Sequence, residues 1–403
     1  MHVLISGASI SGPVLAYWLH RYGFGVTVVE RSPTPRKTGG HAVDLFRPAM
    51  DISEKMGVLA GIEELDAGMG WMNLVREGAR RPARVDLGKV YRATSDRHVE
   101  IMRDDLSEVY YEATRDHVEY LFGDSITSID PDDGAVTFEA AAPRRFDLVI
   151  GADGLRSNVR RLVFGAQAGD TVSLDSYFAV LAVPRELGVV GEYIGHIGPR
   201  RTVGLYAARH LTDARAVFLF RPELGLSYHH RDLSRQKRLV REAFLGMHPR
   251  VDRWLDELDT SPTFYFDQIS QLRMNSWSRG RVTLVGDAGY CPGPVVGGST
   301  SLAVLGAYTL AGELAEADGD PARAFPAYER AMAEPVRRSR AFALGAARAI
   351  HPNTRLGVWA LTQAARLVTA LPTAISAPIA RLNSKGVRMH DSFPIREYPT
   401  PVR

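Results

Sequence analysis

The chain has 403 residues, of which 45% are hydrophobic and 24% are charged, and its formal net charge is +3. This length allows two domains or one large composite domain. The small net charge and the scattered basic residues argue against nucleic acid and anionic membranes as partners. The single cysteine, Cys291, excludes an internal disulfide. Because no apolar run is long enough for a signal peptide or a membrane span, we expect a cytoplasmic protein.

The first thirty residues predict a strand, a glycine turn, a helix and a second strand. The apolar run 2–6 precedes Gly7-Ala8-Ser9-Ile10-Ser11-Gly12, and a second apolar run ends at Glu30. In such a unit the glycines allow a tight turn and close packing, and the N–H groups at the helix start face a pyrophosphate. Glu30 is placed to accept the ribose hydroxyls. The stretch predicts a dinucleotide site, for FAD or NAD, although Ser9 replaces the middle glycine of the usual motif.

The next hundred residues mix loops, helices and strands. The loop 31–44 contains Gly39-Gly40 and is either a solvated connector or backbone laid close to a flat ligand. Helical spacing covers 48–59, short strands are expected between 71 and 100, and a helix is expected from residue 100 to about 116. Asp104 and Asp105 suit the first turn of that helix. Two further strands and a hairpin turn at 132–134 complete this part.

A second informative stretch follows the apolar strand that ends at residue 150. It reads Gly151-Ala152-Asp153-Gly154, and a helix with Ser157 near its start comes next. An acid between two glycines at the carboxyl end of a strand lies where open α/β sheets bind ligands. Residues 171–274 contain short alternating runs that predict an antiparallel sheet able to cover such a site.

The third stretch, residues 280–300, is rich in glycine and proline. A strand ends at Gly286-Asp287, a stiff loop with Pro294 follows, and Gly297-Gly298-Ser299 opens a long helix that reaches about residue 317. Ser299 or Thr300 is expected to cap this helix, whereas uncapped N–H groups would favour an anion or a polarised carbonyl. Helices dominate beyond residue 321, and the tail 390–403 is expected to be extended and partly mobile.

Taken together, the three stretches resemble the FAD-dependent group A aromatic monooxygenases with the para-hydroxybenzoate hydroxylase fold, over about residues 1–345. The segments 39–44 and 291–292 are most similar to the branch of tetracycline-modifying monooxygenases. The resemblance implies an α/β fold with an FAD-binding Rossmann-like domain, an inserted antiparallel-sheet substrate domain and a C-terminal helical segment. The implied boundaries are 1–71, 98–170 and 275–345 for the FAD-binding domain, 72–97 and 171–274 for the substrate-binding sheet domain, and 346–403 for the C-terminal helices and tail.

The resemblance also implies which residues hold FAD. The first motif would meet the pyrophosphate, Glu30 the ribose, and Arg31 would lie near the adenine. Arg103 would touch the ribityl–phosphate region, Asp153-Gly154 would serve both FAD and NAD(P)H, and Asp287 would contact the ribityl chain. The helix start after Pro294 would line the flavin ring. The implied cofactor-binding residues are Gly7, Ser9, Gly12, Glu30, Arg31, Arg103, Asp153, Gly154, Asp287, Pro294, Gly297, Gly298 and Ser299.

The reaction that the resemblance implies is an NAD(P)H-consuming monooxygenation through a flavin C4a-hydroperoxide. It would hydroxylate or epoxidise a polycyclic or aromatic natural product of polyketide type, as in antibiotic biosynthesis, in a monomer or weak homodimer. The flavin carries this chemistry, so neither a catalytic side chain nor a metal is expected. Five residues are candidates for substrate contacts, although each also reads as an ordinary polar residue: His41, Arg47, His196, Tyr206 and Asp267.

Two alternatives remain. The loop 295–299 reads Val-Val-Gly-Gly-Ser where many family members have Gly-Gln-Gly-Met-Asn, which allows an FAD-binding protein that only binds or cyclises its ligand. A NAD-dependent dehydrogenase would satisfy the first motif alone. The motifs around Asp153 and Asp287 argue against it, because such an enzyme needs no acid that binds a ribityl chain.

Overall fold

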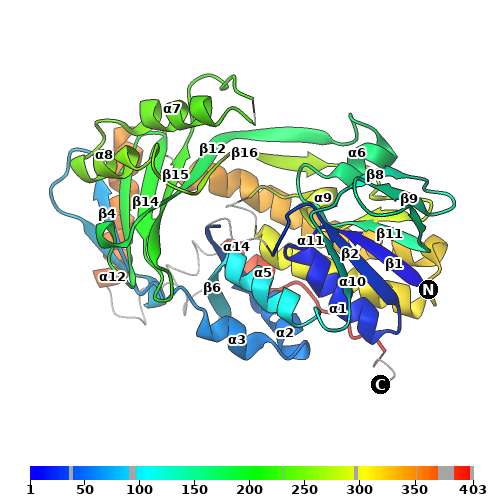
Figure 1. The fold of residues 1–403 in the computed structure, drawn as a ribbon. Coiled ribbons are helices and arrows are strands. Elements are labelled where there is room, and N and C mark those ends of the chain that lie inside the picture. The colour runs from blue at the N-terminus through cyan, green and yellow to red at the C-terminus, as the bar shows by residue number, and fades with distance from the viewer. Residues whose placement is uncertain are drawn as a thin grey trace.

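The fold is mixed α/β, as predicted, and is built around two large sheets (Figure 1). The computed structural model describes residues 1–35, 40–89, 97–229, 231–294, 298–350, 352–370 and 385–399. Among these residues no helix is long and apolar enough to cross a membrane.

The first sheet has six strands in the order β17-β18-β11-β1-β2-β7. All neighbours are parallel except β17 and β18, and the central strand β1 is fully buried at Val3, Leu4 and Ile5. Burial on both faces explains the continuous apolar runs in the sequence. The strands are β1 (His2–Ser6), β2 (Gly25–Glu30), β7 (Glu119–Phe122), β11 (Leu148–Gly151), β17 (Ser278–Arg279) and β18 (Val282–Leu284).

Helices α1 (Ser11–Arg21) and α10 (Ser299–Glu316) pack against each other beside this sheet. α10 is buried almost throughout because its sequence is apolar on every side, which is typical of a helix in the middle of a core. Helices α6 (Asn158–Phe164) and α9 (Asp287–Tyr290) each begin shortly after a strand of the sheet ends.

A two-stranded ribbon connects the two parts of the molecule. β3 (Ala42–Phe46) pairs antiparallel with β6 (His98–Met102), and α2 (Arg47–Lys55), α3 (Leu59–Glu64) and α5 (Arg103–Glu112) adjoin it. The predicted helix start at residue 100 is therefore wrong. Residues 100–102 pair with β3, and the helix begins at Arg103, because cross-strand pairing outweighs local preference. A small separate sheet contains β8 (Ile126–Ile129), β9 (Ala135–Phe138) and β10 (Arg144–Arg145).

The second large sheet has seven strands in the order β16-β12-β15-β14-β13-β4-β5. Only β13 and β4 run parallel. Helices α7 (Leu233–Phe244) and α8 (Pro249–Asp256) cover one face, and the other face is turned toward the ribbon (Figure 1). The strands are β4 (Trp71–Arg76), β5 (Ala83–Asp86), β12 (Asp170–Pro184), β13 (Glu192–Gly198), β14 (Arg201–Tyr206), β15 (Asp213–Phe220) and β16 (Phe264–Arg273).

The C-terminal part contains α11 (Pro321–Ile350), α12 (Arg355–Ala370) and α14 (Lys385–Asp391). α12 packs on β4 and β5, and α14 packs on α11, α2 and β3. The tail that the sequence predicts to be partly mobile packs against the core over residues 390–399. His390, Phe393 and Tyr398 are buried, and a Cβ on Gly312 would meet the Tyr398 ring at 2.2 Å. Two aromatic side chains thus anchor the extended segment to the core.

Candidate functional site: a cofactor cradle beside an apolar hollow

The turn between β1 and α1 leaves no room for a side chain at Gly7 or at Gly12. Gly7 has a φ of +110°, and a Cβ there would lie 2.6 Å from the Ala152 carbonyl oxygen. A Cβ on Gly12 would lie 1.9 Å from the Gly7 carbonyl oxygen. The first turn of α1 has neither a side-chain cap nor an acidic residue, so its N–H groups are available to an anion.

Glu30 ends β2 beside this turn. Its carboxylate accepts hydrogen bonds from the backbone N–H groups of Ala8 and Ser32, both at 2.9 Å. Arg31 follows it and is exposed. The carboxylate therefore lies next to the glycine turn, where the sequence placed it, and it also fixes the local backbone.

Arg103, the first residue of α5, connects several predicted site residues. Its guanidinium donates to the Ser9 hydroxyl at 3.1 Å, and its backbone N–H donates to the His41 carbonyl. Ser107 of the same helix donates to the Ser9 carbonyl. Ser9 is thus held from two directions, which explains how a serine is accommodated where a glycine is usual.

Asp153 forms hydrogen bonds with residues at the start of α6. Its carboxylate accepts hydrogen bonds from the backbone N–H groups of Asn158 and Val159 and from the Ser157 hydroxyl. Burial raises the pKa of Asp153, and these hydrogen bonds oppose the rise. Gly154 has a φ of +79°, which favours glycine. The structure therefore shows Asp153 organising the start of α6, with the Ser157 hydroxyl capping that helix through the Arg160 N–H.

Asp287 begins α9, and two residues separate it from the end of β18. Burial raises the pKa of its carboxyl, whereas the Cys291 thiol and the charge of Arg103 oppose the rise. Burial also raises the pKa of Cys291, so that thiol is protonated at neutral pH. Arg103, which donates to Ser9 of the first motif, also interacts electrostatically with Asp287 of the third motif, so the two motifs lie close together.

The start of α10 lacks the predicted cap. Gly298 is the N-cap residue with a φ of +62°, Ser299 is the first helical residue, and no side chain of the described residues caps the helix. The expectation that Ser299 or Thr300 caps this helix is therefore wrong, because the left-handed Gly298 starts it. Pro294 lies in the preceding turn. Gly297 and the unusual Val295-Val296 pair lie outside the described residues.

Four of the five candidate substrate residues lie near the ribbon or on the sheet face turned toward it. The His41 ring meets Phe178 edge-on, and the Tyr206 hydroxyl accepts the Ala42 N–H at 2.7 Å. Arg47 begins α2. Asp267 lies beside Phe178 in the sheet register and accepts hydrogen bonds from Arg156 and Tyr265. Burial and the charge of Arg103 lower the pKa of His41 to about 4.

His196 lies elsewhere. It points to the opposite face of the sheet, where its ring lies 4.2 Å from that of His248 and 5.5 Å from that of Trp254. Side chains alternate along a strand, so one residue of difference in phase decides which face a side chain occupies. Apolar and polar residues do not alternate regularly in β13, so its sequence does not show which face His196 occupies.

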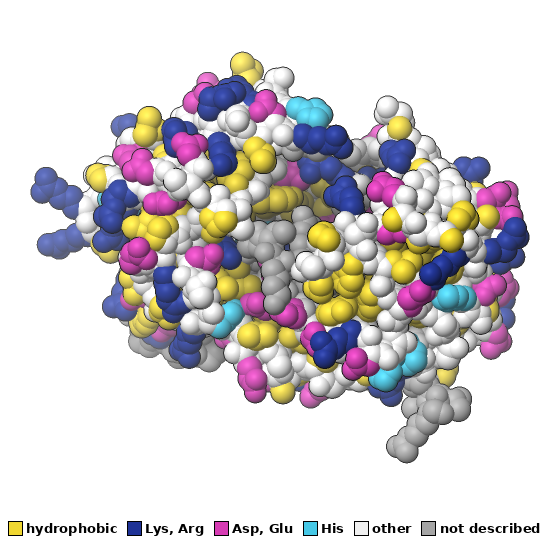
Figure 2. All heavy atoms as spheres, in the orientation of Figure 1, with side chains coloured by type: hydrophobic (Ala, Val, Ile, Leu, Met, Phe, Trp, Pro, Cys, Tyr) yellow, Lys and Arg dark blue, Asp and Glu magenta, His cyan; other side chains and the backbone are white. Residues whose placement is uncertain are grey.

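Sequence reasoning missed two acids and a histidine on the ribbon. Asp44 and Glu100 are direct cross-strand partners, and His98 pairs with Asp44 at 2.7 Å. They share a face with Ala42 and Met102, which pack toward the seven-stranded sheet. Figure 2 shows that the surface is hollowed between the two sheets, with apolar side chains along its walls. Only the register of β3 on β6 could have revealed this group.

The geometry fits FAD. Gly7 and Gly12 let the turn between β1 and α1 pack tightly on neighbouring backbone, and the starts of α1 and α10, which lack a side-chain cap among the described residues, offer N–H groups to a pyrophosphate and to a flavin ring. Gly286, which precedes Asp287, lies against Ser11 of α1 and Ala303 of α10, and the Asp287 carboxyl can accept ligand hydroxyls. No cluster of three or more metal-ligating side chains occurs among the described residues.

Comparisons with known proteins agree with this geometry. The model of the FAD binding domain family matches residues 1–354. An uncharacterized protein of Mycobacterium tuberculosis is 44% identical over 81% of this chain and 88% of that protein. A flavin-dependent monooxygenase of Legionella longbeachae is 34% identical over 89% of this chain and 88% of that protein.

Among solved structures, the tetracycline destructase Tet(55) superposes with a TM-score of 0.84 and 30% identity, over 98% of each chain. The matched family segment covers both large sheets and stops before α14. The chain belongs to the FAD binding domain family and is a group A flavin-dependent monooxygenase.

Proposed function

We propose that this monooxygenase oxidises a polycyclic, polyketide-like aromatic compound and uses NAD(P)H as its reductant. The observation that carries the substrate class is the sheet face across from the ribbon. Phe178, Tyr206 and Ile269 lie on that face, and Met102 packs against it from β6. Apolar and aromatic walls suit a flat ligand with few charges. The similarity to a tetracycline destructase supports a ligand with several fused rings.

Bound FAD would supply the activation of O2 and the transfer of one oxygen atom. The chain would hold the pyrophosphate at the Gly7–Gly12 turn and the ribityl hydroxyls at Asp287. His41 is neutral at pH 7, since its pKa is about 4, so it can donate one hydrogen bond to a ligand without adding charge. The apolar walls would exclude water from the reacting groups.

The test is oxygen incorporation by the FAD-loaded protein. A panel of aromatic polyketides, tetracycline included, is mixed with the protein, NADH or NADPH, and 18O2. We expect at least one ligand to stimulate consumption of reduced nicotinamide and to gain one labelled oxygen atom. A panel member that binds and is altered without label or nicotinamide consumption would reject this proposal. That result would favour an FAD-binding protein that cyclises its ligand.

A further inference from the structure

His390 of α14 is a buried histidine with no hydrogen-bond partner among the residues that the structure describes. Its exposure is 1%, and neither ring nitrogen has a partner among the described residues. Phe46 stacks on the ring at 5.0 Å, and Phe342 and Phe393 meet it edge-on. Buried polar groups normally find partners, so a ring held this firmly with both nitrogens unpaired points to a bound ligand.

The ring of His390 is aimed at the start of α10. A Cβ on Gly298 would lie 2.6 Å from both Cε1 and Nε2 of the imidazole. α10 has 18 residues, and its first turn contains neither a side-chain cap nor an acid. The helix start and the imidazole therefore face the same place, which suits a carbonyl oxygen or an anionic edge of a ligand.

The charge state of His390 suits a neutral donor. Burial lowers its pKa to about 4, Asp44 opposes this shift, and Arg338 adds to it. At neutral pH one ring nitrogen therefore carries a hydrogen and the other accepts one. A ligand at the helix start can receive that N–H without displacing a protein partner.

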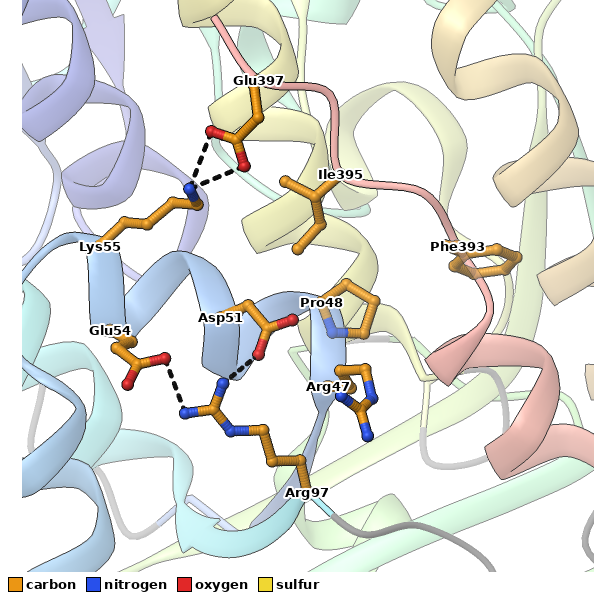
Figure 3. A pocket seen from close by; sticks show the side chains of 9 residues that line it. All are labelled: Arg47, Pro48, Asp51, Glu54, Lys55, Arg97, Phe393, Ile395 and Glu397. Carbon is orange, nitrogen blue, oxygen red and sulfur yellow. Dashed lines mark hydrogen bonds and ion pairs between the residues drawn. The ribbon is translucent and has the colours of Figure 1, made fainter. Parts of the chain in front are cut away.

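The tail holds α14 in position. The Asp391 carboxylate accepts the Arg47 N–H at 3.1 Å, and Arg396 pairs with Glu313 of α10 at 2.8 Å. Figure 3 shows Phe393, Ile395 and Glu397 of the tail beside α2, where Lys55 donates to the Glu397 carboxylate. These residues line an open groove with a volume of about 560 Å³. The placement of His390 thus depends on contacts at both ends of a short segment.

We propose that His390 is a cofactor-contacting residue that donates a hydrogen bond to the polar pyrimidine edge of the flavin ring at the start of α10. This inference rests on the proposed cofactor role of that helix start. It adds to the site a residue from beyond the matched family segment, which ends at residue 354. The contact orients the ring and favours the negative charge that the ring gains on reduction.

The test compares FAD binding and redox behaviour in three variants of the full chain. His390→Phe keeps an aromatic ring among Phe46, Phe342 and Phe393 but removes both nitrogens, and His390→Gln keeps an N–H donor. His196→Phe is the matched control, because His196 is also buried and its Nε2 has no partner in the described part of the chain, but it lies on the far face of the seven-stranded sheet. The readouts are the dissociation constant of oxidised FAD and the midpoint potential of bound FAD.

We expect His390→Phe to weaken FAD binding about tenfold and to make the midpoint potential of bound FAD more negative. His390→Gln should restore part of the affinity and part of the potential. His196→Phe should change neither quantity. If His390→Phe fails to fold, the 15N chemical shifts of wild-type protein labelled at histidine provide a second measurement. The His390 signals are those that disappear from the spectrum of His390→Gln. The His390 resonances should move when FAD is added. Wild-type affinity and potential in His390→Phe, or unmoved resonances, would overturn the inference. Oxygen incorporation is measured separately, so either proposal can fail while the other stands.

Discussion

Asp44 and Glu100 lie directly opposite each other on β3 and β6, on the ribbon face turned toward the seven-stranded sheet. Burial raises the pKa of Glu100 to about 8, the charges of Asp44 and Asp66 add to this, and His98 opposes it. Because the folded-state pKa lies above the ordinary value of 4.5, this group's contribution to stability is complete below pH 4.5 and is lost as the pH rises through 8.

We therefore expect Glu100→Gln to remove a pH-dependent loss of stability between about pH 4.5 and 8, on the order of a few kcal/mol. Thermal unfolding across this range would measure it, with the exposed Glu64→Gln on α3 as the control. Parallel profiles for Glu100→Gln and the wild type would contradict the expectation.

A methyl group on Gly12 should abolish the cofactor cradle. Its Cβ would lie 1.9 Å from the Gly7 carbonyl oxygen, and both groups belong to backbone that cannot simply rotate away. We expect Gly12→Ala to lose bound FAD and about 2 kcal/mol of stability or more. Gly61→Ala on α3 is the control, because nothing lies within 4 Å of its Cβ and alanine favours a helix. Flavin absorbance of the purified proteins and their melting temperatures measure both effects. Gly12→Ala protein purified with a full complement of FAD would contradict the expectation that the added methyl group disrupts the cradle.

Asp287→Asn should separate cofactor binding from folding. The side chain is partly buried and burial raises the pKa of its carboxyl, so the amide should leave the stability of the FAD-free protein unchanged or higher. The dissociation constant for FAD should rise by roughly tenfold or more, since an amide offers one acceptor oxygen to the ligand hydroxyls where the carboxyl offers two. Fluorescence titration measures this, and Asp256→Asn, on the exposed side of α8, should behave as the wild type. Equal FAD affinity in both variants would remove Asp287 from the site.

Gly312→Ala tests whether the tail depends on its contact with α10. The added Cβ would meet the Tyr398 ring at 2.2 Å, whereas nothing lies within 4 Å of a Cβ on Gly345 of α11. We expect Gly312→Ala to release the residues around Tyr398 to proteolysis and to lower the melting temperature, and Gly345→Ala to do neither. Tails equally resistant to protease would show that Tyr398 does not anchor the segment.

The glycine turns could be predicted from the sequence because their requirements are local. Gly7, Gly154 and Gly298 all have positive φ values, and each follows the signal that a strand is ending or a helix is starting. The sequence also predicted that residues 171–274 hold strands of a sheet separate from the one that begins at His2, because their alternation differs from the continuous apolar runs of buried parallel strands.

The residues that the sequence missed owe their positions to contacts between distant segments. Glu100 faces the hollow only because β6 pairs with β3, and His390 reaches Gly298 only because the tail returns to α10. His196 shows the same limit in reverse. Its residue type suggested a site, but the phase of β13 turns it toward Trp254. Neither composition nor periodicity within a segment contains this information.

The strand order of the six-stranded sheet determines how long β11 lacks one of its two neighbours while the chain is being synthesised. β11 pairs with β1 and with β18, yet β18 follows it by about 130 residues. At about 5–20 residues per second, β11 is the outermost strand of the growing sheet for roughly 7–25 s on the ribosome. An exposed, fully apolar strand edge is a template for unwanted pairing. We therefore expect ribosome-stalled chains that end before residue 278 to be captured by chaperones at β11, and chains that include β18 to escape them.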